Sequence, residues 1–205
     1  MKTKTIYLLR HGQTDYNKNG LVQGRGVDAS LNDVGRKQAT AASNHFKDLP
    51  IDRFFSSSLI RTHETLAPFG VDFTPLEGFD EISWGAFEGL ETTPDDKNLY
   101  RATINGWRTG LLDAAIGGGE SPRDVKARQE EAMKQVLEDE SETILICMHG
   151  RAMRILLCWL LSYPLNYMDG FPHQNCAFYG LQYVADRFSI RAFNYCKHLD
   201  VLKKD

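Results

Sequence analysis

The segment Thr143–Met148 constrains the fold of this chain more than any other stretch. After Thr143 it is apolar at every position, without the polar alternation of a half-exposed strand, which is typical of a strand covered on both faces of a parallel sheet. An amphipathic helix is predicted before it, from Ser121-Pro122 to about Glu138, and an apolar helix follows at 152–161. A buried strand between two helices predicts the α/β class.

Strand and helix patterns alternate along the rest of the chain as well, and no internal repeat or low-complexity linker divides it. We therefore predict one domain over residues 1–205, a three-layer α/β/α sandwich with a mostly parallel central sheet and a small helical lid at about 88–119. The other predicted elements are a strand at 5–9, a helix that Asn32 caps and Pro50 ends, a strand at 53–56, a short helix from Leu59 to before Pro68 with Ser57 and Ser58 as caps, and two strands at 176–184 and 188–194.

The charge pattern argues against polymeric partners. The chain has 205 residues, a formal net charge of -3 and no long run of like charges, so we expect neither nucleic acid nor a membrane surface as a partner. The apolar stretch at 6–9 is too short for a signal peptide or a membrane span, which predicts a cytoplasmic protein. One apolar stripe fits either the core or a homodimer surface: Leu156, Trp159, Leu160 and Tyr163.

Two of the predicted buried strands end in a histidine followed by glycine, as Arg10-His11-Gly12 and as His149-Gly150. If these strands are neighbours, both imidazoles face one pocket, because ligands gather beyond the carboxyl ends of the strands in such sheets. Arg10 flanks the first histidine, and Arg61 lies in the first turn of a helix whose free N–H groups also favour an anion. This set predicts a site for a tetrahedral oxyanion such as phosphate.

Phosphoryl transfer also needs a nucleophile and an acid for the leaving oxygen. His11 suits the first role, because an imidazole keeps a free lone pair near pH 7 and nearby arginines favour its neutral form; its other nitrogen should donate to a backbone carbonyl. Glu81 suits the second role. Beside Trp84 and Phe87 in a partly dry pocket, a carboxyl group stays protonated more readily, and it then serves as base for the attacking water.

Taken in order, these motifs resemble the histidine phosphatase superfamily, also called the phosphoglycerate mutase-like family. The resemblance extends from Ile6 to Gly150, and it is specific because separated pieces agree in their order. One departure is Met148, which stands where the family often has Ser or Thr before the second histidine. The matching pieces are 10–17, 31–39, 57–62, Glu81 with 84–89, 118–121 and His149-Gly150.

The resemblance implies roles for particular residues. It implies that His11 becomes phosphorylated, that Arg10, Arg61 and His149 hold the phosphoryl group, and that Glu81 is the proton donor. It implies no metal and no cofactor. Four further residues are candidates for binding phosphate or substrate: Asn17, Thr14, Gln23 and Gly150.

Several functions remain to be weighed. A phosphatase acting on a small phosphorylated metabolite, a monoester, is favoured over a phosphoglycerate mutase, because the mutase branch carries a basic insertion after the acid and residues 91–117 contain only Lys97, Arg101 and Arg108 as basic residues. A non-catalytic module that binds a phosphorylated ligand would need no acid such as Glu81. A metal-dependent hydrolase lacks the H-x-H and H-E-x-x-H patterns. The sequence does not identify the substrate.

Overall fold

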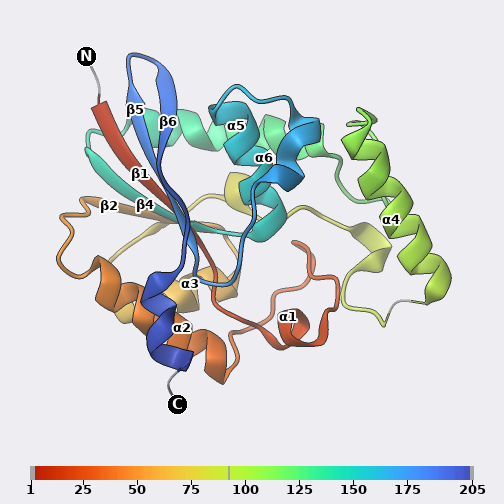
Figure 1. Cartoon of the computed structure of the whole chain (residues 1–205), viewed down its shortest axis with the longest axis horizontal. Coiled ribbons are helices and arrows are strands. Elements are labelled where there is room, and N and C mark those ends of the chain that lie inside the picture. Colours follow the sequence, from red (N-terminus) through yellow and green to blue (C-terminus); the bar gives the residue numbers. More distant parts are fainter. Residues whose placement is uncertain (1–2, 92, 204–205) are drawn as a thin grey trace.

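A six-stranded sheet lies at the centre of the computed structural model, which describes residues 3–91 and 93–203 (Figure 1). The strand order is β3-β2-β4-β1-β5-β6. The first four strands of this order run parallel, and β5 and β6 add an antiparallel hairpin at one edge. The strands are β1 (Thr3–Arg10), β2 (Arg53–Ser56), β3 (Thr74–Pro75), β4 (Thr143–Met148), β5 (Phe178–Val184) and β6 (Arg187–Tyr195).

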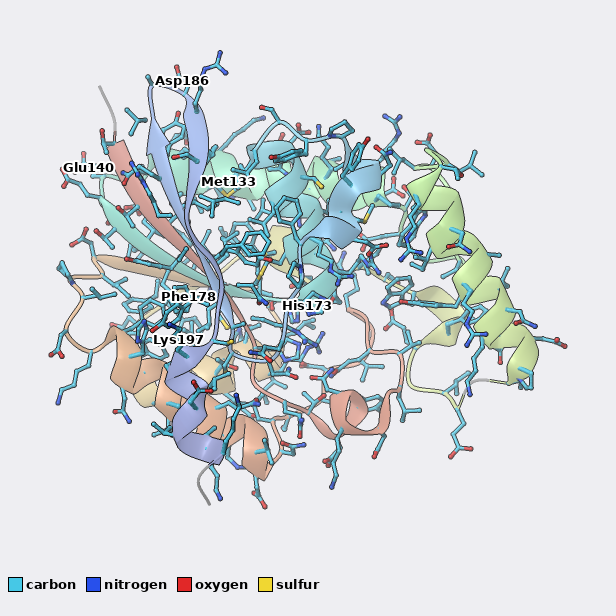
Figure 2. All side chains as sticks on the ribbon, in the orientation of Figure 1. Met133, Glu140, His173, Phe178, Asp186 and Lys197 are labelled. Atoms are coloured by element: carbon cyan, nitrogen blue, oxygen red, sulfur yellow. The ribbon has the colours of Figure 1, made fainter. Side chains whose placement is uncertain are left out.

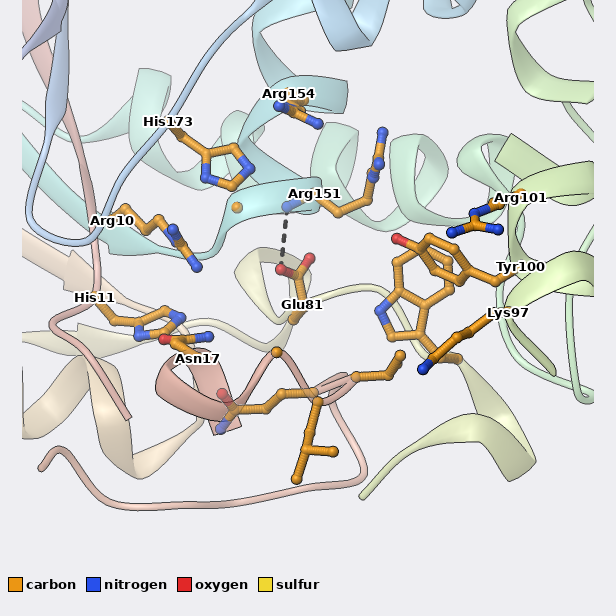
Figure 3. Close-up of a pocket in the computed structure, with 16 residues that line it drawn as sticks. Arg10, His11, Asn17, Glu81, Lys97, Tyr100, Arg101, Arg151, Arg154 and His173 are labelled. Carbon is orange, nitrogen blue, oxygen red and sulfur yellow. Dashed lines mark hydrogen bonds between the residues drawn. The ribbon is translucent and has the colours of Figure 1, made fainter. Parts of the chain in front are cut away.

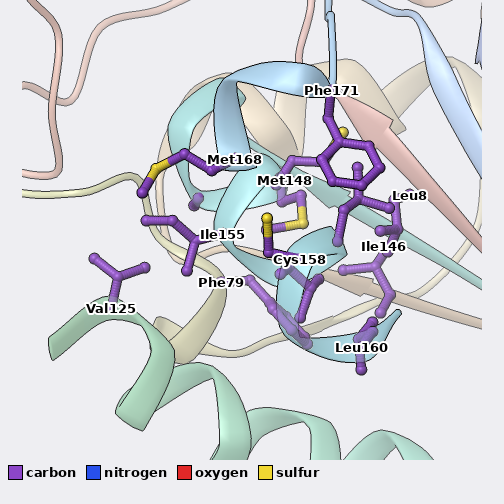
Figure 4. Close-up of a cluster of buried hydrophobic side chains, with 14 of the residues drawn as sticks. Leu8, Phe79, Val125, Ile146, Met148, Ile155, Cys158, Leu160, Met168 and Phe171 are labelled. Atoms are coloured by element: carbon purple, nitrogen blue, oxygen red, sulfur yellow. The ribbon is translucent and has the colours of Figure 1, made fainter. Parts of the chain in front are cut away.

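Helices cover both faces of the sheet, so the predicted three-layer α/β/α class is confirmed. The apolar residues of α5 and α6 pack on one face in a large cluster that includes Leu8 and Ile146 (Figure 4). Those of α2, α3 and the C-terminal 3-10 helix pack on the other face. The helices are α1 (Asp15–Asn19), α2 (Asp33–Phe46), α3 (Ile60–Leu66), α4 (Pro94–Arg108), α5 (Pro122–Glu138) and α6 (Gly150–Leu160), with 3-10 helices at Ala67–Phe69, Glu77–Phe79, Gly85–Phe87, Leu165–Gly170 and Lys197–Lys203.

Two predicted strands, Arg53–Ser56 and Thr143–Met148, have the predicted bounds, and the helix capped by Ser121 begins at Pro122 as expected. The predicted serine caps of α3 are wrong. Leu59 occupies the N-cap without a side-chain bond, and the first helical N–H, of Ile60, donates to the carboxylate of Asp28 at 2.7 Å. The anion that we expected at this helix start is therefore supplied by the protein itself.

The turn between β5 and β6 and the loop after β1 depend on backbone conformations or close backbone contacts that few residues allow. Ala185 and Asp186 both have positive φ at the β5–β6 turn, where Asp186 also accepts a bond from Tyr183 (Figure 2). Gly12 leaves β1 against Gly35 of α2, and a Cβ on Gly12 would lie 2.6 Å from the Gly35 carbonyl oxygen. Glycine at both positions therefore lets α2 approach the loop that carries His11.

No helix in the described part of the chain is long and apolar enough to cross a membrane.

Candidate active site

The pairing of β1 with β4 brings the two predicted histidines together. The strands are parallel neighbours in a register that pairs Arg10 with Met148, so that His11 and His149 leave the sheet side by side. The backbone N–H of His11 donates to the Met148 carbonyl at 3.0 Å. The ring centroids of the two histidines are 5.0 Å apart, and both side chains are buried. The strands are therefore neighbours, which was the condition for a shared pocket, although His11 lines the cavity and His149 does not.

A hydrogen bond to the backbone fixes His11 in the tautomer in which Nε2 can act as the nucleophile. Its Nδ1 lies 2.7 Å from the Gly12 carbonyl oxygen, which can only accept, so the ring proton lies on Nδ1 and the lone pair lies on Nε2. Burial lowers the pKa of His11 well below its ordinary value, and the charges of Arg61 and Arg10 lower it further. The imidazole is therefore neutral at pH 7, with burial rather than the arginines as the larger cause.

Arg61 and His149 form a layer behind His11. Arg61 is fully buried, and its Nε–H donates to His149 Nδ1 at 3.1 Å. The proton of His149 must then lie on Nε2, which donates to the Ser57 hydroxyl at 2.7 Å. The other Arg61 nitrogens donate to the carbonyl oxygens of Val27 and Gly24. Burial lowers the pKa of Arg61 to about 10, so it keeps its charge at neutral pH.

A cavity of about 590 Å³ opens in front of His11 (Figure 3), within the size range of small-molecule sites. Six of the nine predicted site residues line it: Arg10, His11, Asn17, Gln23, Glu81 and Gly150. The remaining three, Thr14, Arg61 and His149, are fully buried and do not line it. Direct contact between phosphate and Arg61 or His149 stays a prediction.

Thr14 serves to place two neighbours rather than to face the cavity. Its hydroxyl donates to Gln23 Oε1 at 2.8 Å and accepts from the backbone N–H of Asn17, which caps α1. The side-chain amide of Asn175 donates both to Asn17 Oδ1 at 2.9 Å and to the His11 carbonyl at 3.0 Å. Asn175 thus connects the α1 loop to the nucleophile loop, a link between distant segments that no local sequence pattern indicates.

Three buried nitrogen atoms on the cavity wall have no hydrogen-bond partner among the described residues: Arg10 Nε, Gln23 Nε2 and His173 Nδ1. The first two are donors, and an unpaired buried donor is costly unless a ligand or water meets it. Burial lowers the pKa of Arg10 to about 10, which leaves it charged at pH 7. The wall is therefore set up to receive an acceptor with negative charge.

Glu81 lies at the middle of the cavity and at the start of α6 (Figure 3). Its Oε1 accepts from the backbone N–H groups of Ala152 at 2.8 Å and Ile82 at 2.9 Å, and its Oε2 accepts from that of Arg151 at 3.1 Å. The carboxylate thus caps α6 from a distant segment. We expected a dry aromatic wall around the Glu81 carboxylate, but backbone N–H groups contact its oxygens instead. Of the expected aromatic pair, Trp84 lines the cavity and Phe87 does not.

Arg128 on α5, which our sequence analysis did not single out, fixes the loop that carries Glu81. One guanidinium nitrogen, Nη1, donates to the carbonyl oxygens of Gly78 at 2.9 Å and Asp80 at 3.0 Å. The other, Nη2, donates to the carbonyl oxygen of Glu81 itself at 3.0 Å and to the carboxylate of Glu120. The rigid fork of arginine can satisfy such a set, whereas lysine cannot.

The cavity also contains basic side chains outside the predicted set, among which His173 is neutral at pH 7 because burial lowers its pKa to about 3. His173, Arg151 and Arg154 line it near His11 and Glu81, and Lys97 and Arg101 reach it from α4 (Figure 3). Lys97 and Arg101 had been noted only as basic residues of the predicted lid. Arg151 directly follows the second histidine motif and Arg154 lies three residues further along, and this closeness in sequence was the signal available for them.

Comparison with known proteins agrees with this geometry. A protein of Schizosaccharomyces pombe named as a probable phosphatase is 48% identical over 156 residues, which cover 74% of this chain and 70% of the relative. A protein of Salmonella choleraesuis named as a probable phosphoglycerate mutase is 28% identical over 186 residues, covering 87% of this chain and 84% of the relative.

A solved mycobacterial glucosyl-3-phosphoglycerate phosphatase matches the structure with a TM-score of 0.85 at 26% identity, over 94% of this chain and all of that one (100%). The family model for the histidine phosphatase superfamily (branch 1) matches residues 6–195. The chain belongs to the histidine phosphatase superfamily.

Proposed function

We propose that this chain is a metal-independent phosphatase that hydrolyses a small phosphate monoester through a phosphohistidine at His11. The observation that carries the proposal is the state of His11 itself. Its proton is held on Nδ1 by the Gly12 carbonyl, its imidazole is neutral at pH 7, and it lines a cavity together with Arg10 and Glu81. These are the nucleophile, anion ligand and acid that phosphoryl transfer requires.

In the first step the Nε2 lone pair of His11 attacks phosphorus, so that an N–P bond forms while the ester P–O bond breaks. The leaving oxygen takes a proton from Glu81. The backbone N–H groups of Ile82, Arg151 and Ala152 donate to the carboxyl oxygens of Glu81. The same hydrogen bonds keep the carboxyl group at a fixed place between phosphate and leaving group.

In the second step Glu81, now ionised, takes a proton from water, whose oxygen attacks phosphorus. The O–P bond forms, the N–P bond breaks, and the products are inorganic phosphate and neutral His11. Arg10 neutralises the equatorial oxygens throughout, with Arg61 one layer behind. The Gly12 carbonyl stabilises the positive charge that His11 carries while it is phosphorylated.

The proposal predicts turnover without a divalent metal. We expect the purified chain to release phosphate from p-nitrophenyl phosphate at an unchanged rate in excess EDTA, because arginine guanidiniums supply the positive charge that a metal supplies elsewhere. A colorimetric phosphate assay with and without EDTA measures this, with a known magnesium-dependent phosphatase as control. Loss of activity in EDTA, restored by added metal, would overturn the metal-independent mechanism.

Arg128 gives a second prediction, for a positioning residue. Arg128→Met removes the fork that holds the Glu81 loop, so we expect kcat to fall by about tenfold or more, with KM little changed. Because Glu81 is also the base of the second step, the two substrates are compared by the rate at which the phosphoenzyme forms, measured by rapid quench. That rate should fall more for an alkyl phosphate than for p-nitrophenyl phosphate, whose leaving group departs without a proton. Lys134→Met, an exposed cation on the same helix, is the control. Equal losses on both substrates would mean that Arg128 does not act through Glu81.

The similarity to a protein named as a phosphoglycerate mutase supports one competing function. A mutase would isomerise phosphoglycerate faster than it hydrolyses it when bisphosphoglycerate is supplied. Following both products by phosphorus NMR separates the two activities, and we expect hydrolysis to dominate.

A further inference from the structure

The end of the cavity opposite His11 carries positive charge that the chemistry at His11 does not use. Lys97 and Arg101 of α4 lie across the cavity from His11, with Glu81 between (Figure 3). Both are exposed. Neither side chain makes a hydrogen bond or an ion pair with any residue in the described ranges 3–91 and 93–203, in contrast to Arg108 of the same helix, which pairs with Asp169 at 3.0 Å.

The spacing of these two cations has an energetic cost. Lys97 and Arg101 are four residues apart on α4, so they lie on one face of the helix on successive turns. A like-charged pair at this spacing weakens a helix, whereas a pair of opposite charge would stabilise it. The face that bears this cost is the one that lines the cavity. An anion bound between the two side chains would remove the repulsion.

The floor of the cavity adds to the excess of positive charge. Arg151 and Arg154 both pair with Asp169, at 2.6 and 2.9 Å, and Asp169 also takes the bond from Arg108. One carboxylate therefore serves three guanidiniums. Five cationic side chains line the cavity, against the carboxylate of Glu81: Arg10, Lys97, Arg101, Arg151 and Arg154. This charge exceeds what one phosphate dianion at His11 would balance.

Helix α4 is anchored so that its cations have a defined place. Trp107 is buried, stacks on Trp84 at 5.7 Å between ring centroids, and donates from its indole to the Ala114 carbonyl at 2.8 Å. Two helical turns on the N-terminal side, Tyr100 also contacts Trp84, at 5.0 Å between ring centroids, and both rings line the cavity. The space between His11 and the α4 cations is therefore bordered by an aromatic wall that suits the uncharged body of an organic molecule.

We propose that the substrate carries a second anionic group, a carboxylate or a second phosphate, which binds Lys97 and Arg101 while the scissile phosphate lies at His11. The inference rests on the proposed function and adds the substrate class to it. The two ends of the cavity therefore bind different groups of the substrate: one end binds the phosphoryl group that is transferred, and the other binds an anionic group that is not transferred.

Matched esters test the proposal. We would compare kcat/KM for 3-phosphoglycerate with that for glycerol 3-phosphate, and for a hexose bisphosphate with that for the corresponding monophosphate. The wild-type chain should prefer the doubly anionic member of at least one pair by about tenfold, and the pair that shows the preference identifies carboxylate or phosphate. Lys97→Ala combined with Arg101→Ala should bring that ratio close to one.

The control is Lys37→Ala combined with Lys134→Ala, which removes the same charge from exposed positions that do not line the cavity and should leave the ratio unchanged. Equal rates within both pairs for the wild-type chain, or an unaltered ratio in the Lys97/Arg101 variant, would overturn the second-anion site while leaving the phosphatase intact. Absence of all turnover would overturn the proposed function instead. Calorimetric titration of the same esters into wild type and variant then decides the second-anion site by binding alone.

Discussion

Replacing His11 with alanine is expected to lower phosphatase turnover by about 10⁴-fold or more, because removal of a nucleophile leaves only what binding and charge can contribute. Release of phosphate from p-nitrophenyl phosphate measures the loss. The buried arginines remain in place, and the substrate is still expected to bind. KM should therefore change much less than kcat.

The matched control is His45→Ala. Like His11, His45 contacts another ring: it stacks on Tyr195 at 5.1 Å between ring centroids, but it lies on α2 outside the cavity. We expect that variant to retain the rate of the wild-type chain, and circular dichroism should show that both variants are folded. A folded His11→Ala variant with wild-type turnover would refute the assignment of the nucleophile.

Glu81→Gln is expected to have the second largest effect, and its size should depend on the leaving group. Glutamine keeps the shape of the side chain but can neither give nor take the proton, so general acid catalysis worth about 10²- to 10⁴-fold is lost for an alkyl phosphate. For p-nitrophenyl phosphate the first step needs no acid. The phosphoenzyme should then form at nearly the normal rate and accumulate, because Glu81 is also the base of the second step.

Rapid-quench kinetics with both substrates measure these two steps separately. Glu91→Gln changes an exposed carboxylate in the segment before α4 and serves as the control, with unchanged rates expected. If Glu81→Gln lowered the rates for both substrates equally and no phosphoenzyme accumulated, the carboxyl group would have a structural role only. That role would be to cap the start of α6 through its hydrogen bonds.

The parts of the fold that the sequence predicted are those where burial pattern and local signals agree. Residues 144–148 are all apolar and buried, as expected for a strand covered on both faces, and Ser121-Pro122 places the start of α5 through local backbone chemistry. The short elements were missed for the opposite reason. β3 is two residues long and depends on pairing with β2, and α1 has five residues with none buried. Neither leaves a periodic pattern in the chain.

The features of the site divide in the same way into those with a local sequence signal and those without one. His11 and His149 were predictable because each follows a recognisable strand, and adjacency of the two strands does the rest. Their hydrogen-bond partners were not, since the link from Arg61 to His149 spans 88 residues and the link from Asn175 to the His11 carbonyl spans 164. The environment of Glu81 also differs from the expectation, because tertiary packing set its carboxylate at the start of α6. Contacts of this kind follow from the assembled fold rather than from local sequence.

The central claim is that a phosphoryl group passes through Nε2 of His11. The most direct measurement is to mix the chain with a rapidly hydrolysed monoester, quench within one turnover, and locate the phosphoryl group by mass spectrometry of peptides kept at alkaline pH. The account predicts an acid-labile adduct on the peptide that contains His11, present in the wild-type chain and absent from His11→Ala. An adduct on another residue, or turnover with no adduct at any time after mixing, would contradict it.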